Sequence, residues 1–377
     1  MKIVFISNFF NHHQMYFSDA MNEILDSNYY FIQTVPVPEE RKQLGYNDKD
    51  FPCYVKYSYE SSESLAECQK IIDEADVAIV GSAPEHMLKN RKKAGKIIFR
   101  YAERPLKNGL EPLKYIPRLV RWNLWNPRLK PIYLLCASAY TAGDYRKFGL
   151  FKNKAYKWGY FPETKKYADF EQLISQKEIT KILWCGRFLD WKHPADILKA
   201  AEKLKEKGYD FTLEYIGQGE EEESLRQLCN RYGLESQVQF MGSMKPEQVR
   251  EHMEKAGIYV FTSDRQEGWG AVLNEAMNSG CAVVASHAIG AVPFLVKNNK
   301  NGLVYESGNI DMLCDKLEYL LMNSEEQCRL GEAAYYTILE KWNAEMAAER
   351  FLELVKNILA GNKCPDLYVN GPCSRAD

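Results

Sequence analysis

The stretch Asp264-Arg-Gln-Glu-Gly-Trp-Gly-Ala-Val-Leu-Asn-Glu-Ala-Met-Asn-Ser-Gly-Cys-Ala-Val-Val-Ala285 contains a glycine-flanked loop, a helical segment and an apolar strand. A further apolar strand, residues 258–261, leads into it. Strand, loop, helix and strand in this order build a parallel sheet that is covered by helices. The stretch therefore predicts a doubly wound α/β domain, in which ligands bind beyond the carboxyl ends of the strands.

Two carboxylates stand eight positions apart in this stretch, Glu267 in the loop and Glu275 inside the helix. A helix N-terminus opened by glycines offers free backbone N–H groups and a positive dipole end, which suit a phosphate. Carboxylates accept hydrogen bonds from sugar hydroxyls. The geometry fits a nucleotide sugar, with the hexose at Glu267, the diphosphate on the helix end and the ribose at Glu275. The alternative is a pair of solvated acids. The backbone expected to approach the phosphates is that of Gly268, Trp269, Gly270, Ala271 and Val272.

The same region resembles the Glu-x7-Glu region of family 4 of the retaining GT-B glycosyltransferases, and the resemblance extends over residues 181–308. The matching motifs are Cys185-Gly-Arg187, Lys192, Ile216-Gly-Gln-Gly219, Phe240-Met-Gly242 and Gly280-Cys-Ala-Val-Val-Ala285. The resemblance implies two Rossmann-like domains that face each other across a cleft. It also implies transfer of a hexosyl-type sugar from a nucleotide diphosphate, expected to be UDP, with retention of configuration and without a metal or other cofactor. Gly217, Gly219 and Gly242 would then line the donor site without side-chain chemistry.

Arg187 and Lys192 follow the apolar strand at residues 182–185, and Pro194 is well placed to begin the next helix. Two cations beyond the end of a strand suit a diphosphate leaving group, because a guanidinium binds it with a fork of donors and an ammonium acts as a point charge. Loop cations are usually solvated, and the resemblance is what favours the functional interpretation. Trp269 stands where many family members have Phe; it either shapes the sugar pocket or packs, and packing is favoured.

Composition limits the class of protein. A chain of 377 residues is too long for one ordinary core, and 46% hydrophobic and 27% charged residues are typical of a globular protein. A net charge of -2 argues against a nucleic-acid-binding surface. The ten cysteines show no paired spacing, which predicts buried thiols in a reducing compartment, and so the cytoplasm. No apolar run approaches the ~18 residues of a membrane span, and the first residues indicate a core strand rather than a signal peptide.

Alternation of apolar and amphipathic runs predicts two successive doubly wound units. We expect an acceptor-side domain over residues 1–162 and a nucleotide-sugar domain over 163–342. Residues 343–377 would form a last helix over 344–359 and a loose tail from 364. The resemblance implies that this helix crosses back to the first domain. The expected strands lie near residues 3–7, 30–34, 77–81, 97–100, 132–136 and 155–158, and then 182–185, 212–216, 238–241, 258–261, 282–285 and 302–304.

The acceptor site is the least specified part of the sequence. His12 and His13 follow the first strand at the expected start of a helix, where an imidazole can orient or deprotonate a hydroxyl. A capping or surface role fits each histidine equally, because this loop lacks the glycines common in the family. Glu103 and Arg104 follow another strand of the same sheet and are further acceptor-side candidates. Asp48 and Asp50 form an Asp-x-Asp, the metal motif of single-domain GT-A enzymes, but we interpret them as a solvated turn and predict no metal.

Residues 89–130 hold thirteen cations and two anions, with Trp122 and Trp125 among the arginines. Cations and tryptophans together suit an anionic membrane surface. The segment predicts an enzyme that lies on the inner face of the cell membrane and glycosylates a glycan or lipid-linked glycan in cell-surface polysaccharide or glycolipid assembly. The alternative is a solvated face.

Three other functions remain to be weighed. An NAD-dependent oxidoreductase has the same kind of sheet, but it needs Gly-x-Gly-x-x-Gly after a strand, and the first loop, Ser7-Asn-Phe-Phe-Asn-His12, contains no glycine. A GT-B epimerase of sugar nucleotides would use a similar cleft without an acceptor. A non-catalytic sugar-binding module is the third alternative.

Overall fold

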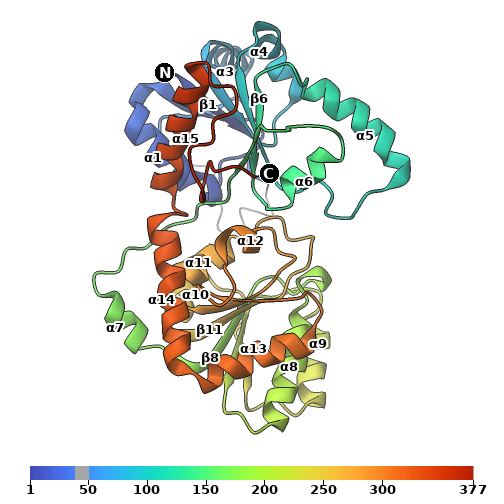
Figure 1. Cartoon of the computed structure of the whole chain (residues 1–377), viewed down its shortest axis with the longest axis vertical. Coiled ribbons are helices and arrows are strands. Elements are labelled where there is room, and N and C mark those ends of the chain that lie inside the picture. The colour runs from blue at the N-terminus through green and yellow to red at the C-terminus, as the bar shows by residue number, and fades with distance from the viewer. Residues whose placement is uncertain (39–50, 377) are drawn as a thin grey trace. The chain divides into compact units, whose positions relative to one another are not determined.

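The computed structural model of the chain describes residues 1–38 and 51–376 (Figure 1). The chain divides into two compact units, unit 1 with residues 1–162 and 344–377 and unit 2 with residues 163–343. Each unit is built on one parallel sheet with helices against it. The predicted fold class of two doubly wound α/β domains is therefore confirmed. Asp48 and Asp50 lie outside the described residues.

Unit 1 contains a seven-stranded sheet in the order β3-β2-β1-β4-β5-β6-β7. The central strands are fully buried apolar runs, as expected for parallel strands that are covered on both faces. The strands are β1 (Ile3–Ser7), β2 (Tyr29–Gln33), β3 (Val55–Tyr57), β4 (Val77–Val80), β5 (Ile97–Ala102), β6 (Ile132–Cys136) and β7 (Ala155–Lys157). The helices are α1 (His12–Leu25), α3 (Ser62–Glu74), α4 (Lys89–Ala94), α5 (Pro112–Trp125), α6 (Thr141–Arg146) and α15 (Ala344–Leu359).

The last helix, α15, packs in unit 1 beside α1 (Figure 1). The ring of Phe351 lies 6.2 Å from that of Phe17 on α1 and 4.9 Å from that of Phe99 on β5. Edge-on aromatic pairs of this kind add to the area that the helix buries. Unit 1 therefore depends on residues from both ends of the chain.

Residues 371–376 pair with the edge strand β7, and the expectation of a loose tail is wrong for them. Arg375 forms an antiparallel bridge with Tyr156 at the edge strand β7. The backbone N–H of Lys157 donates to Ser374 and that of Cys373 donates to Lys157, at 2.7 and 2.9 Å. The Pro and Gly content predicted disorder, but the unpaired edge of β7 supplies hydrogen-bond partners for these residues.

Unit 2 contains a six-stranded sheet in the order β10-β9-β8-β11-β12-β13. Its strands are β8 (Glu178–Cys185), β9 (Thr212–Ile216), β10 (Val238–Phe240), β11 (Ala256–Phe261), β12 (Ala282–Ser286) and β13 (Leu303–Tyr305). Its helices are α7 (Phe170–Ser175), α8 (Pro194–Glu206), α9 (Glu222–Arg231), α10 (Pro246–Lys255), α11 (Val272–Asn278), α12 (Val292–Leu295), α13 (Ile310–Met322) and α14 (Ser324–Glu340). Pro194 begins α8, as its fixed φ predicts.

Every strand that the sequence predicts is present, with small shifts at the ends. The largest shift is in β8, which begins at Glu178 instead of residue 182. Its first four residues, Glu-Ile-Thr-Lys, are mostly polar and none of them is buried, so they lack the apolar run that predicts a strand. The short edge strand β3 was not predicted. It has three residues and one of them is Lys56, too little for a periodic signal.

Candidate functional site

The candidate donor site lies at the point of unit 2 where the order of the strands reverses. From β8 the chain continues to its neighbour β9 on one side, and it later returns to β11 on the other side. The loops that follow β8 and β11 therefore lead away in opposite directions beyond the carboxyl ends of adjacent strands. Such a switch point is where open α/β sheets bind ligands.

Lys192 and Glu267 meet at this point as an ion pair. The Nζ of Lys192, at the end of a 3-10 turn (Asp190–Lys192), donates to Oε2 of Glu267 over 2.6 Å, and Ser263 Oγ donates to the same oxygen over 2.9 Å. The two charged side chains are only 12% and 13% exposed. A pair so poorly hydrated requires both partners, because removal of one leaves an uncompensated charge.

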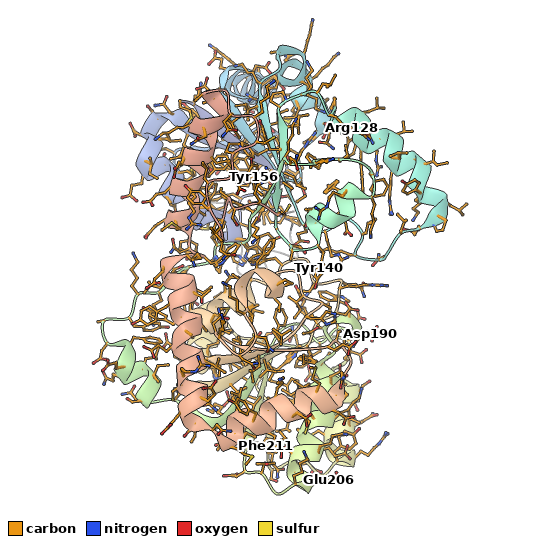
Figure 2. All side chains as sticks on the ribbon, viewed as in Figure 1. Arg128, Tyr140, Tyr156, Asp190, Glu206 and Phe211 are labelled. Atoms are coloured by element: carbon orange, nitrogen blue, oxygen red, sulfur yellow. The ribbon has the colours of Figure 1, made fainter. Side chains whose placement is uncertain are left out.

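Hydrogen bonds hold the two loops together below the ion pair. The backbone N–H of Asp264 donates to the carbonyl of Trp191 over 3.0 Å. Thr262 Oγ1 donates to the carbonyl of Lys192 over 2.6 Å and accepts from Trp184 Nε1 over 2.9 Å. Trp184 is buried in the core of the unit, so its hydrogen bond to Thr262, and that of Thr262 to Lys192, hold the backbone of Lys192 in place. Asp190, in the same loop, is labelled in Figure 2.

Arg187 lies in the loop after β8 and is exposed. No acidic side chain among the described residues pairs with it. Its guanidinium therefore presents free N–H donors to solvent, as a loop that binds an anion would.

The glycines after β8, β9 and β10 allow three loops to approach one another. A Cβ on Gly217, whose φ is +138°, would lie 1.9 Å from the carbonyl oxygen of Gly186, and one on Gly219 would lie 2.4 Å from that of Phe188. The N–H of Gly217 donates to the carbonyl of Gly242 over 2.8 Å. The backbone packing explains these glycines by itself, so their proposed place beside a nucleotide rests on the resemblance.

Glu275 lies on α11 at the same end of the sheet. Burial raises the pKa of its carboxyl above the ordinary value, and the charge of Arg250 opposes this shift. Burial, and then the charge of Glu275, raise the pKa of the Cys185 thiol to about 12, while Lys192 acts in the other direction. No hydrogen bond from a described side chain reaches the Glu275 carboxylate. It is therefore able to accept hydrogen bonds from a ligand hydroxyl.

The stretch between the two glutamates has a tightly constrained backbone. Gly270 has a φ of +90°, and a Cβ there would lie 2.5 Å from the ring of Phe261. Trp269 is fully buried, donates from Nε1 to Asn274 Oδ1 over 2.9 Å and packs against Trp342, so its side chain has the packing role that the sequence favours. The expected helix begins at Val272 and is only seven residues long. Gly268, Gly270 and Ala271 thus precede it as a loop.

Unit 1 contains a polar cavity of about 410 Å³ at the carboxyl ends of its strands. His13 and Glu103 line it, so the structure brings together one member of each predicted acceptor-side pair. The rings of His13 and Tyr160 stack with centroids 4.7 Å apart, and the Tyr160 hydroxyl donates to Glu103. Other lining residues are Ser7, Asn8, Asn11, Gln14, Gly81, Ser82, Tyr101, Ala102 and Ala137.

His12 and Arg104 are not in the lining of this cavity. Arg104 lies 3.4 Å from Asp144 Oδ2 and over the ring of Tyr140, which makes it part of the packing of α6 (Figure 2). His12 contacts the ring of His13 at a centroid distance of 3.8 Å. His12 and Arg104 both follow a strand, as the sequence predicts, but sequence spacing does not determine the direction in which a side chain points.

Sequence analysis missed several residues of both sites. Gly81 follows β4, and a Cβ there would lie 2.8 Å from Oγ of Ser7 at the end of β1. Gly81 therefore allows the loops after β1 and β4 to lie close together, a role that the sequence analysis looked for only in the loop after β1. Its position directly after an apolar strand was the available signal. Tyr160 and Ser263 carry no such signal, because a lone hydroxyl has no characteristic spacing.

The basic segment 89–130 is less basic at the surface than its composition predicts. Arg91 is fully buried and donates to the backbone carbonyls of Ile72, Ala75 and Ile97. Lys92 and Arg100 both pair with Glu85. Trp122 is buried in the core, so the expectation that it lies at a membrane surface is wrong. The composition gives the number of charged residues, but it does not distinguish charged side chains that are buried or paired within the fold from those that face solvent.

No helix in residues 1–38 and 51–376 is long and apolar enough to cross a membrane. In the same residues no group of three or more His, Cys, Asp or Glu side chains is arranged to hold a metal ion.

Comparison with known proteins concerns mainly unit 2. The model of the family described as "Glycosyl transferases group 1" matches residues 165–337. An uncharacterized glycosyltransferase of Haemophilus influenzae is 30% identical over 177 residues, which are 45% of this chain and 49% of the relative. The chain resembles the glycosyl transferases of group 1. The resemblance to glycosyltransferases that the sequence indicates is thereby confirmed, and the role of the Glu-x7-Glu motif stays a prediction.

A second relative of these group 1 transferases is the GDP-mannose-dependent alpha-(1-6)-phosphatidylinositol monomannoside mannosyltransferase of Mycobacterium tuberculosis, 22% identical over 52% of each chain. The chain thus matches about half the length of these curated relatives. The crystal structure of HepE from Anabaena in complex with UDP covers 95% of this chain and 100% of its own, with a TM-score of 0.70 and 16% identity. This likeness confirms the expected GT-B fold.

Proposed function

We propose that the chain is a retaining glycosyltransferase. It transfers a hexosyl-type sugar from a nucleotide-diphosphate sugar, bound by unit 2, to a hydroxyl of a glycan or lipid-linked glycan, in cell-surface polysaccharide or glycolipid assembly. The proposal rests on a likeness that extends over the fold and over the motifs of unit 2.

One observation carries the proposal. At the switch point of unit 2 a poorly hydrated Lys192–Glu267 pair joins the loops that follow β8 and β11. Among the described residues, the unpaired Arg187 lies in the first of these loops, and Glu275 lies on α11, the helix that follows the second. Lys192 and Arg187 would compensate the charge of the departing diphosphate, Glu267 would accept hydrogen bonds from hexose hydroxyls and Glu275 from the ribose. Electrostatic stabilisation of this kind is typically worth several kcal/mol.

In the proposed reaction the bond between the anomeric carbon and the diphosphate oxygen breaks. The acceptor oxygen forms the new bond from the same face, and the proton of its hydroxyl leaves on the diphosphate. No covalent glycosyl-enzyme is required, and Glu267, paired with Lys192, is not a free nucleophile. The departing charge is balanced by protein cations, so the proposed reaction does not use a metal.

For the nucleotide we propose UDP. The solved structure of HepE contains UDP, whereas the mycobacterial relative is named for GDP-mannose. UDP is preferred because the likeness to HepE covers nearly the whole chain. The acceptor would enter through unit 1, where the imidazole of His13 and the carboxylate of Glu103 line the cavity together with serine and tyrosine hydroxyls and asparagine and glutamine amides, which suit a sugar.

Neither rival enzyme class gains support from the named relatives, which are glycosyltransferases. The experiment that separates them incubates the purified chain with labelled UDP-glucose, UDP-galactose, UDP-N-acetylglucosamine or GDP-mannose. One arm contains water alone, and the other contains a membrane extract or glycan mixture as acceptor. A transferase labels the acceptor and leaves the donor nearly intact in water, whereas an epimerase interconverts the donor without an acceptor.

A third arm adds EDTA. Labelling of the acceptor should persist, and complete loss that Mn²⁺ or Mg²⁺ restores would contradict the metal-independent reaction. If no donor labels the acceptor and the sugar nucleotide is interconverted in water alone, the chain is an epimerase and the transferase proposal is contradicted.

A further inference from the structure

The helix α5 is apolar on two opposite sides, and only one of them is covered by the protein. Its inner side carries Trp122, which is buried, and Tyr115 and Leu119, which are packed against the core of unit 1. The rings of Tyr115 and Trp122 lie 5.1 and 4.6 Å from that of Phe148. These contacts attach α5 to the unit through its inner side.

The other side of α5 is a stripe of exposed aliphatic residues, here called the outer face. It consists of Leu113, Ile116, Val120 and Leu124, which are 94%, 69%, 55% and 70% exposed. At about 100° per residue these four positions fall within about 80° of one another, opposite the inner side. Leu129, just beyond the helix, is 100% exposed. Single exposed apolar residues are common, but a continuous stripe marks a binding surface.

Cations border this stripe. Residues 110–130 contain five cations and one anion. The anion, Glu111, pairs with Lys114 and Arg118, whereas Arg121 lies over the ring of Trp125 at 5.1 Å. Figure 2 labels Arg128 beside the end of α5, where the helix stands at the margin of its unit. An apolar stripe flanked by cations and a tryptophan is typical of a helix that lies in the plane of a membrane surface.

We propose that α5 docks unit 1 onto an anionic lipid bilayer, with its outer face in the boundary between headgroups and acyl chains. Aliphatic side chains supply most of the affinity, and Arg121 and Arg128 supply the preference for anionic lipid. This differs from attachment by a basic surface, which the buried and paired cations of residues 89–104 do not provide. The inference does not depend on the proposed transferase activity.

The test is flotation of the full-length chain with vesicles of phosphatidylcholine alone or mixed with phosphatidylglycerol. The wild type should float with the mixed vesicles, and Ile116→Gln/Leu124→Gln should weaken binding at least about tenfold. The matched control is Ile24→Gln/Val369→Gln, which changes aliphatic residues that are 49% and 90% exposed elsewhere in unit 1. It should bind within about twofold of the wild type. Thermal unfolding should be the same for all three proteins.

Salt and charge separate the apolar contribution from the electrostatic one. Arg121→Gln/Arg128→Gln should lose the preference for phosphatidylglycerol, whereas raising the salt should reduce wild-type binding without abolishing it. The proposal is overturned if the wild type ignores mixed vesicles at low salt, or if the α5 variant binds as the wild type does. It is also overturned if ultracentrifugation shows a dimer that the α5 variant abolishes while neither protein binds vesicles. Vesicle binding needs no sugar donor, so none of these outcomes bears on the transferase proposal.

Discussion

The switch points of the two units offer the same geometry, but they are built from different chemistry. In unit 2, close-packed glycines and a buried ion pair fix three loops, and the candidate residues recur at spacings that can be read along the chain. In unit 1, a polar cavity whose lining includes the Glu103 carboxylate is assembled from single residues of several loops. Under the proposed function, the difference teaches that the site for a constant ligand group, the diphosphate, leaves a motif in the sequence, whereas the site for a variable acceptor does not.

Glycine substitutions should give the largest contrast between the units. In Gly217→Ala the new Cβ would lie 1.9 Å from a backbone oxygen at a φ of +138°, so neither contact nor strain can relax. We expect a loss of about 3 kcal/mol in the free energy of unfolding. In Gly81→Ala the only close contact of the new Cβ, at 2.8 Å, is with the Ser7 hydroxyl, which can rotate away at the cost of its hydrogen bonds with Asn8 and Gln14, so we expect a loss of about 1 kcal/mol. Urea unfolding measures the free energy of unfolding of both variants. Equal losses would contradict the expected difference between the glycines of the two units.

Substitution of the charged residues in unit 2 should lower turnover in a protein that still folds, and the two variants that break the Lys192–Glu267 pair should be less stable than the wild type. Lys192→Ala, Arg187→Ala and Glu267→Gln should each reduce turnover at least about tenfold, or ~1.4 kcal/mol of transition-state stabilisation. Arg187 is exposed, so its variant should keep wild-type stability, which makes it the cleanest of the three. Steady-state rates measure the effect, and near-normal turnover in all three variants would refute the site.

The two histidines of unit 1 form a matched pair. His13→Gln should reduce turnover several-fold with a saturating donor, because His13 lines the cavity and stacks on Tyr160, whereas His12→Gln should have little effect. The Michaelis constant for the acceptor should change with His13, and that for the donor should not. If the two substitutions have equal effects on turnover, the cavity lined by His13 is not the acceptor site.

The smallest effect concerns the pH dependence of stability. Burial raises the folded-state pKa of Glu275, so at neutral pH the folded protein holds an unfavourable carboxylate. As the pH falls through the raised pKa, the folded state takes up a proton before the unfolded state does, and stability rises. Glu275→Gln should therefore have a higher melting temperature at neutral pH. The gain should vanish as the pH approaches 4.5, the ordinary value for glutamate. A variant that is less stable at neutral pH would contradict this.

The sequence predicted the fold well because buried parallel strands are apolar runs that need no context, as at β1 and β6. It placed Lys192 and Glu267 at adjacent strand ends, but their ion pair could not be predicted, since it depends on the hydrogen bonds of Thr262 and Trp184. The basic segment was misjudged for the same reason. Arg91 and Trp122 are both buried, but an arginine or a tryptophan contributes equally to the composition whether it faces solvent or the core.

The most direct test of the central claim is a thermal shift of the full chain with UDP, GDP and ADP, without any acceptor. A ligand at 100 times its dissociation constant stabilises the folded state by about 2.7 kcal/mol, which is a readily measured shift. The account predicts that UDP raises the melting temperature of the wild type and of His13→Gln alike, and that Arg187→Ala/Lys192→Ala loses most of the shift. It would be contradicted if no nucleoside diphosphate stabilises the wild type, or if the double variant keeps the full shift.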